Sequence, residues 1–184
     1  KTLNKTEVGG LNFLCRNMND NTIIGDKFPK SGKDFRLIDL RYVNGIKGDK
    51  CEVYKSKILK KNLYALIKNE IRIPTIYLQA RINNFKFLCF NLPVKIVQYK
   101  NDGMTNNLLK YKLKSPNYTY LTYLELYKLK LNNVKIYEYL SLSINYWRFY
   151  LHADYKYRKK INKNLILFFL SIFLGSILYM NDKI

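Results

Sequence analysis

The most regular pattern of hydrophobic and polar positions lies between residues 110 and 144. Hydrophobic side chains there alternate with lysine, serine or tyrosine in two runs, YKLKL at 127–131 and VKIYEYLSLSI at 134–144. A repeat of two residues predicts β-strands, because successive side chains of a strand point to opposite faces. Asn132 and Asn133 separate the runs, and Asn tolerates positive φ, so the pattern predicts a tight hairpin. Its outer face, rich in lysine and tyrosine, is either a surface for nucleic acid or an ordinary solvated one.

Other segments predict further strands at 35–43, at 51–54 and at 83–99, where Asn91-Leu92-Pro93 divides the strand into two pieces. Residues 1–35 are mostly polar and predict a loop-rich N-terminal arm. From residue 146 the chain is aromatic and basic. The pattern therefore predicts a mostly β protein up to residue 145, followed by a C-terminal segment at 146–184.

An apolar run, LILFFLSIFLGSILYM at 165–180, carries no charge. At about 1.5 Å per residue it predicts a helix somewhat shorter than the roughly 30 Å hydrocarbon core of a bilayer. Lys163 and Lys183 stand close to its two ends and could reach the headgroups. Two alternatives stay open, a membrane anchor and a hydrophobic tail buried inside a large assembly.

The charge balance points to an anionic partner. The chain of 184 residues has 33 Lys and Arg against 13 Asp and Glu, a net charge of +20. A compact protein with this charge repels itself unless an anion is close by, and RNA, DNA and anionic lipid are the candidates. Lys, Asn, Ile, Tyr and Phe have AT-rich codons, so an AT-rich, organellar genome would supply many of the lysines. The scarcity of acidic residues needs a further reason, and a polyanionic partner is the simplest.

The residues that usually carry chemistry are sparse. Cys15, Cys51 and Cys89 are far apart and form no CxxC pair, which argues against a zinc site or a disulfide framework. His152 is the single histidine, and no Ser/His/Asp or Cys/His arrangement can be assembled around it. We therefore expect no enzymatic activity, no metal, no cofactor and no small-molecule substrate.

Short segments along the chain resemble, in order, motifs of a known family. They are GKDFRLIDL at 32–40, GI at 45–46, NLYAL at 62–66, NLPV at 91–94, KSPNY at 114–118, KLNNV at 130–134 and LSIN at 142–145. The order resembles that of the large-subunit ribosomal protein L-two family, whose motifs include R-x-I-D-F, N-I-A-L-L, N-x-L-P-L and A-T-I-G. The glycine- and histidine-rich loop near the family's C-terminus has no counterpart here, so the role of that loop is not carried over.

The resemblance implies two small β-barrels, an OB-like one at 36–81 and an SH3-like one at 82–145, wrapped by ribosomal RNA near the peptidyl-transferase region. The function it predicts is that of a structural rRNA-binding protein in the large subunit of a mitochondrial ribosome. Its partners would be ribosomal RNA and neighbouring ribosomal proteins. The alternative is a single-pass accessory subunit of a mitochondrial inner-membrane complex, anchored in lipid by residues 165–180 and bound to other subunits.

In the ribosomal hypothesis, basic side chains replace counterions on folded RNA and tyrosines pack on sugars and bases. The expected RNA-binding residues are Arg36, Arg41, Lys47, Lys110, Lys112, Lys114, Lys128, Lys130, Lys135, Arg148, Arg158, Lys159 and Lys160.

Overall fold

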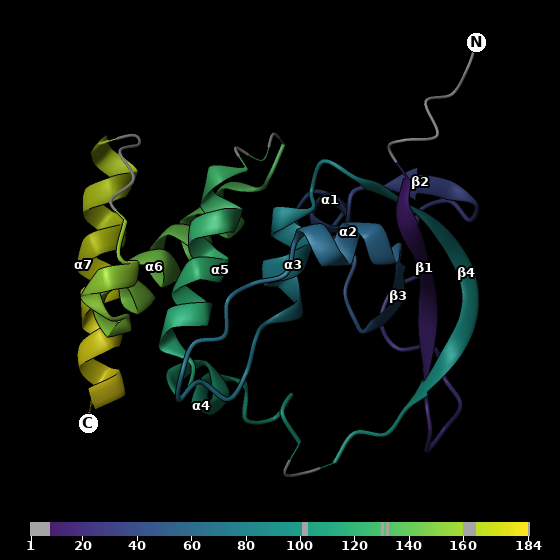
Figure 1. The fold of residues 1–184 in the computed structure, drawn as a ribbon, viewed down its shortest axis with the longest axis horizontal. Helices are drawn as coiled ribbons and strands as arrows, with labels where there is room; N and C mark the ends of the chain where they lie inside the picture. The colour runs from purple at the N-terminus through teal and green to yellow at the C-terminus, as the bar shows by residue number, and fades with distance from the viewer. Residues whose placement is uncertain (1–7, 101–102, 130, 132, 160–164, 184) are drawn as a thin grey trace. The chain divides into compact units, whose positions relative to one another are not determined.

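The computed structural model describes residues 8–100, 103–129, 131, 133–159 and 165–183. The chain divides into two compact units, each built from two stretches of sequence (Figure 1). The sheet unit comprises Lys1–Tyr64 and Arg81–Thr105, and the helical unit comprises Ala65–Ala80 and Asn106–Ile184.

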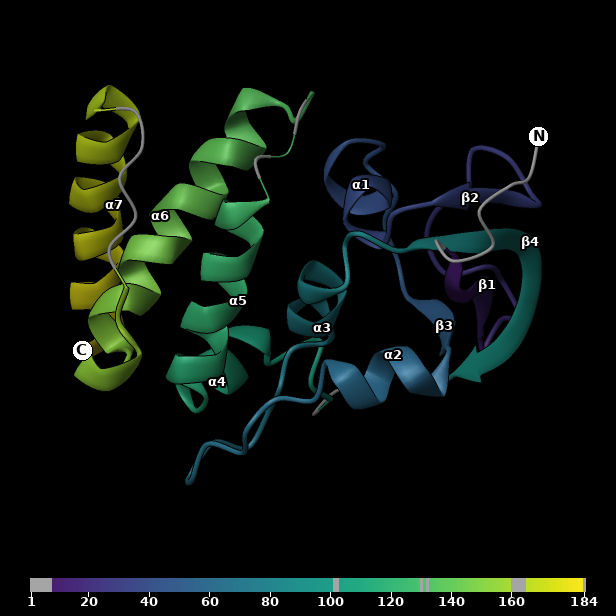
Figure 2. The ribbon, with the colours of Figure 1, turned by 45° about the horizontal axis from the view of Figure 1, so that its top comes forward.

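The sheet unit is built on a four-stranded open sheet. Its two central strands, β1 (Val8–Asn17) and β4 (Lys86–Val97), are parallel. The edge strand β2 (Lys33–Phe35) pairs antiparallel with β4, and the edge strand β3 (Lys50–Tyr54) pairs antiparallel with β1, giving the order β2-β4-β1-β3. Two short helices, α1 (Leu37–Tyr42) and α2 (Ser56–Lys61), lie on the same side of the sheet in Figure 1 and in Figure 2.

One face of this sheet and the helix α1 form the core of the unit. Leu14 on β1, Phe87 on β4 and Ile38 on α1 are fully buried. The register of β4 against β1 shifts between Phe13 and Leu14, which pair with Phe90 and Pro93. Proline cannot donate to a sheet ladder and is found at such irregularities, so the strand continues through the interruption expected at 91–93.

The helical unit contains α3 (Thr75–Arg81, whose last residue belongs to the sheet unit), α4 (Leu108–Leu113), α5 (Pro116–Lys128), α6 (Ile136–His152), a 3-10 turn (η2, Tyr155–Tyr157) and α7 (Leu165–Lys183). The helix α6 packs against α5 and against α7. The core of the helical unit is mostly aromatic: Tyr120 and Leu124 from α5 and Tyr146 and Phe149 from α6 are all buried.

Hydrogen bonds join the N-terminal turn of α5 to the loop that precedes α3. The carboxylate of Glu70 accepts the backbone N–H groups of Asn117 and Tyr118, at 2.6 and 2.8 Å. These N–H groups belong to the first turn of the helix, where they have no partner within the helix and where negative charge is favourable. In return, the hydroxyl of Ser115 accepts the N–H of Ile71 at 3.1 Å. The loop and the helix terminus therefore satisfy each other's polar groups.

Replacement of Asn117 by alanine is expected to destabilise the helical unit by about 1–3 kcal/mol. Its side chain is 5% exposed and joins α5 to the end of α6: it donates to the carboxylate of Asp154 (3.1 Å) and accepts the N–H of Asp154 (2.8 Å). Urea unfolding followed by the fluorescence of Trp147, the single tryptophan, measures the change. The matched control is Asn145→Ala, because the side chain of Asn145 donates to the carbonyl of Ser141 on its own helix in an exposed hydrogen bond (2.9 Å), and its loss should cost less than 1 kcal/mol. Equal losses in the two variants would contradict the prediction.

The predicted mostly β fold with two barrels is wrong. The protein is mixed α/β, with one open sheet and no closed barrel among the described residues. The segment expected to be the OB-like barrel contains α1, β3, α2 and α3, and the segment expected to be the SH3-like barrel contains β4, α4, α5 and the start of α6. The expected loop-rich arm contains β1, a central strand. The barrels were implied by the family resemblance, which therefore has no support from the fold.

The segment 110–144 is helical because its tyrosines also satisfy a helical repeat. Tyr120 and Tyr127 are seven residues apart, which places them on one side of α5. The two-residue repeat of the second run stops at residue 144. A helical repeat continues past that point, because Leu142, Tyr146 and Phe149 follow one another at spacings of four and three residues. Asn133 does have positive φ (61°), but the turn it forms lies between two helices.

Candidate nucleic-acid interface

Many of the acidic side chains are engaged within the fold. In the sheet unit, Asp26 accepts the N–H of Lys47 (2.8 Å) and Asp49 accepts the hydroxyl of Tyr99 (2.7 Å). Burial and the Asp49 carboxylate raise the pKa of Tyr99 to about 12, which keeps this hydroxyl a donor. Other carboxylates with polar partners inside the fold are those of Asp20, Asp34, Asp39, Glu52, Glu70, Glu125, Asp154 and Asp182. These carboxylates are held by their own neighbours, so they are poorly placed to neutralise lysines elsewhere on the surface.

Basic side chains of the sheet unit gather on its two helices. Arg36, just before α1, and Arg41, in its last turn, were both predicted to bind RNA, and both are exposed. The Nη1 of Arg36 lies 4.0 Å from a carboxylate oxygen of Asp39, a loose ion pair. Lys47, also predicted, is exposed and lies in the turn before β3. The helix α2 adds three exposed lysines that the sequence reasoning missed, Lys57, Lys60 and Lys61. The signal was present as the run KSKILKK, four lysines in the seven residues 55–61.

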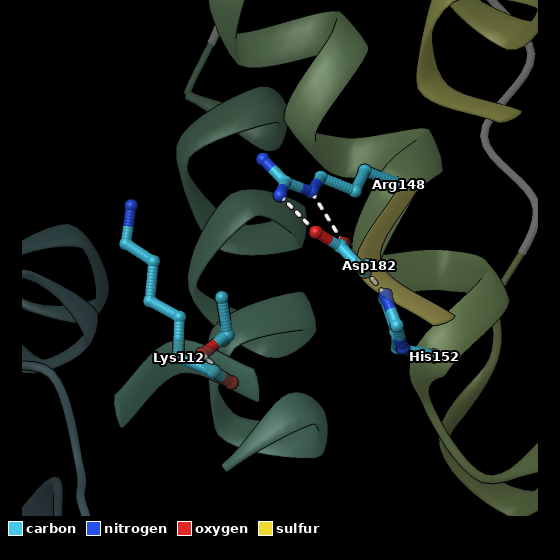
Figure 3. Close-up of polar contacts among 5 residues, drawn as sticks. Lys112, Arg148, His152 and Asp182 are labelled. Carbon is cyan, nitrogen blue, oxygen red and sulfur yellow. Dashed lines mark hydrogen bonds and ion pairs between the residues drawn. The ribbon is translucent and has the colours of Figure 1, made fainter. Parts of the chain in front are cut away.

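Three predicted lysines of the helical unit lie on or next to α4. Lys110 and Lys114 are exposed. Lys112 is half-buried: its Nζ lies 3.0 Å from the hydroxyl of Tyr123 and 5.6 Å from the centre of that ring, a cation–π contact. Its side chain points away from the polar cluster at the α6–α7 interface (Figure 3). Lys110 and Lys114 are therefore the better-placed phosphate ligands on this helix.

The polar cluster between α6 and α7 contains Arg148, another predicted RNA ligand. Its Nε donates to Asp182 at 2.7 Å and its Nη2 donates to the second carboxylate oxygen (Figure 3). His152 Nε2 lies 2.8 Å from the same carboxylate. The side chains of Arg148, His152 and Asp182 are 13%, 11% and 4% exposed. Arg148 therefore holds α7 on α6 and has little surface left for a phosphate.

The same cluster determines the acidity of Asp182. Burial alone would raise its pKa, but the hydrogen bonds and charges of Arg148 and His152 outweigh burial and lower the pKa below its usual range. The carboxylate is thus ionised at neutral pH, as a two-pronged pair with a guanidinium requires.

Arg158 and Lys128 also make contacts within the protein. Arg158 donates to the carbonyl oxygens of Ala153 (2.9 Å) and Leu151 (3.1 Å), and its guanidinium lies 5.3 Å from the centre of the Tyr150 ring. Arg158 therefore satisfies carbonyl groups at the end of α6. Lys128 pairs with Glu125 at 2.8 Å on the surface of α5.

The remaining predicted residues divide into two groups. Lys135 and Lys159 are exposed, and the backbone N–H of Lys159 donates to the hydroxyl of Tyr120 at 2.7 Å. Lys130 and Lys160 lie outside the described residues.

The tyrosines of 110–144, expected to face RNA, differ in exposure: Tyr118 and Tyr120 are 2% and 0% exposed, whereas Tyr137 is 58% exposed. Tyr146, just after this segment on α6, is 1% exposed. Tyr127 stacks on Tyr146 with ring centres 5.5 Å apart. Burial, together with the hydroxyl of Tyr127, raises the pKa of Tyr139 to about 12. Tyr137, whose ring centre lies 5.8 Å from the Nζ of Lys135, is the strongly exposed aromatic side chain of this segment among the described residues.

Across the described residues, no group of three or more His, Cys, Asp or Glu side chains is arranged to hold a metal ion. In the same part of the chain, no helix combines the length and the apolar character needed to cross a membrane. Comparisons with protein-family models, with curated proteins and with solved structures found no match.

Proposed function

We propose that this protein is a structural RNA-binding protein. The observation that carries the proposal is the division of its charges: many carboxylates have hydrogen-bond or ion-pair partners within the protein, while lysines and arginines of α1, α2 and α4 extend from the surface. Each cation that contacts a phosphate releases condensed counterions from the nucleic acid, and this release is the main source of non-specific affinity. The fold needs no chemistry of its own for this role.

The setting we propose is the large subunit of a mitochondrial ribosome, with ribosomal RNA and neighbouring ribosomal proteins as partners. The support is compositional: a net charge of +20 together with an abundance of Lys, Asn, Ile, Tyr and Phe, the residues that AT-rich organellar codons favour. Within this setting, the exposed cations replace counterions where folded RNA strands approach one another.

The RNA-binding proposal predicts a steep salt dependence that α2 helps to set. The affinity for a structured RNA, measured by fluorescence anisotropy, should fall linearly on a log–log plot as salt rises from 50 to 200 mM. Replacing Lys57, Lys60 and Lys61 by glutamine should weaken binding and reduce the slope by roughly 2–3, because each phosphate contact contributes about 0.7–0.9.

The matched control is the triple replacement of the same lysines by arginine, which keeps the charge and should keep the slope. Affinity that barely changes with salt in the wild-type protein would refute the electrostatic mechanism. A glutamine triple with an unchanged slope would move the contacts to other lysines, such as Lys110 and Lys114.

The ribosomal setting is tested separately by sedimentation of an organelle lysate on sucrose gradients. The protein should travel with the large ribosomal subunit, stay there when detergent is added and move to the top after RNase treatment. Co-sedimentation with membranes that detergent alone abolishes would contradict the ribosomal setting and favour the inner-membrane alternative.

A further inference from the structure

The sheet unit has a second face that its described helices leave open. Residues paired in the ladders share a face, so Leu11 is on the same side as Val53 and Leu88, which are its partners on either side. Val53 is 48% exposed, and Leu11 and Leu88 are half-buried. Leu14 and Phe87, on the other face of the sheet, are fully buried. In both views α1 and α2 lie on one side of the sheet, and the burial of Leu14 and Phe87 indicates that it is theirs.

Two phenylalanines stand next to each other in the centre of this open face. Phe13 on β1 and Phe90 on β4 are in register on the two parallel central strands. Their rings are nearly parallel, with an interplanar angle of 21° and centres 5.6 Å apart, and both residues are half-buried. The central strands therefore carry a preformed aromatic stack that reaches the surface.

The two ends of this stack are flanked by small residues. On the β3 side, the partner of Phe13 is Cys51. On the β2 side, the register Lys33 to Cys89 places Gly32 beside Phe90, and the N–H of Gly32 donates to the carbonyl of Cys89 at 2.7 Å. A Cβ built on Gly32 would have no atom within 4 Å. The row across the sheet is thus small, aromatic, aromatic, small, with room for a flat group on either flank.

Lysines stand along β4 on both sides of this row. Lys86 is two residues from Leu88 on the open face, is 40% exposed and pairs with Asp34 at 3.1 Å, which neutralises a carboxylate of that face. Lys95 is exposed on β4 beyond the register shifts that follow Phe90, and its partner in the ladder is the buried Cys15. A chain with flat groups and regularly spaced negative charges is complementary to this surface: rings in the middle, ammonium groups towards the ends.

We propose that the open face of the sheet binds single-stranded RNA by stacking its bases on the Phe13–Phe90 pair, with Lys86 and Lys95 next to the phosphates. The inference rests on the proposed RNA-binding function and assigns one site and one class of RNA to it. Stacking accepts any base because every base has a flat face, so the site should show little sequence preference. Double-stranded RNA, whose bases are already stacked and paired, would bind through the basic helices instead.

The test uses the full chain and two labelled probes, a 12-nucleotide oligouridine and an RNA hairpin of about 12 base pairs, in fluorescence anisotropy at one salt concentration. The double variant F13L/F90L keeps the face apolar but removes both rings. Its affinity for oligouridine should fall about tenfold or more, as for the loss of a stacking platform, while its affinity for the hairpin stays within about twofold. The matched control is F169L/F173L, which removes two exposed phenylalanines of α7, each 65% exposed, and should change neither affinity.

Three outcomes separate the two proposals. A wild-type protein that binds neither probe removes the proposed function and this inference together. A wild-type protein that binds both, with F13L/F90L unchanged or with F169L/F173L equally weakened, overturns the stacking site alone. A dimer that F13L/F90L abolishes and that RNA does not dissociate would identify a second copy of the chain as the occupant and also overturn it.

Photo-crosslinking of the wild-type protein to oligouridine carrying 5-iodouridine does not depend on how well a variant folds. The crosslinked peptides should contain Phe13 or Phe90. Crosslinks confined to α1, α2 or the helical unit would overturn the proposed site.

Discussion

Replacement of Arg148 by alanine should lower the free energy of unfolding of the helical unit by about 3–5 kcal/mol, because it leaves the carboxylate of Asp182 buried without its cation. Asp182 is 4% exposed and both of its oxygens are bound by the guanidinium. Removing one partner of a buried pair costs far more than the pair itself contributes, since the remaining charge has lost both water and counter-charge. Trp147 precedes Arg148 on α6, so urea unfolding followed by its fluorescence reports on this unit directly.

Two controls separate this effect from ordinary loss of charge. Lys128→Ala removes the cation of a surface pair with Glu125 and should cost at most about 1 kcal/mol. The double variant R148M/D182L replaces the pair by apolar side chains of similar length and should recover much of the loss. An Arg148→Ala variant as stable as Lys128→Ala would show that the pair is not enclosed in solution.

The same pair makes the helical unit sensitive to acid. The pKa of Asp182 is lower in the folded protein than the value of about 3.9 expected in the unfolded chain. The pair therefore contributes its full stabilisation above that unfolded value and loses it progressively as pH falls through it towards the folded pKa. His152, which faces the same carboxylate, and the Tyr179 ring stacked edge-on against His152 at 4.6 Å are the other titratable groups in contact. Between pH 6 and pH 3 the wild type should lose more stability than D182N, compared by Trp147 fluorescence.

Local strand signals in the sequence were correct at two of three sites: the strand predicted at 35–43 is wrong, because Leu37–Tyr42 form α1. The strands at 50–54 and 86–97 were predicted within a few residues, since short β-branched or aromatic runs bounded by turn residues fit a half-buried sheet. The run at 110–144 misled because a two-residue and a 3.6-residue repeat share many positions when tyrosine occurs on every side. Tyr118, Tyr120 and Tyr127 are all half-buried or buried in α5, and in a helix their alternation with leucine does not separate two faces.

The sequence did not indicate which basic residues make contacts within the protein and which extend into solvent. Arg148 finds Asp182 at a separation of 34 residues, and Arg158 binds carbonyl groups whose position depends on where α6 ends. Neither partner is visible in a local window. The aromatic pair Phe13–Phe90 is equally non-local, because the parallel pairing of β1 with β4 brings together residues 77 positions apart in the sequence. Net charge alone indicated a polyanionic partner without indicating which cations reach it.

Gly10→Ala should be the most disruptive single-methyl change in the sheet unit, costing about 3 kcal/mol, near the upper end of the usual range for overpacking. A Cβ at Gly10 would overlap the carbonyl oxygen of Val53, a backbone atom of the neighbouring strand β3, and would lie 2.9 Å from the ring of Phe87. A backbone atom cannot rotate away as a flexible side chain can. Either β3 separates from β1 or the buried ring of Phe87 moves, and each weakens the face on which α1 packs.

Buried thiols provide the measurement, because all three cysteines lie in the sheet unit. In a Cys51→Ala background, Cys15 and Cys89 remain, both 0% exposed, and burial raises the pKa of Cys89 to about 12. Their reaction with a thiol reagent therefore requires opening of the sheet, and a loss of about 3 kcal/mol should accelerate it roughly a hundredfold. Gly45→Ala is the control: its position has positive φ (68°) but open space around a Cβ, so backbone strain of about 1 kcal/mol should accelerate labelling less than tenfold. Equal rates in the two variants would mean that β1 and β3 are not packed as closely as the ladder from Gly10 to Leu14 requires.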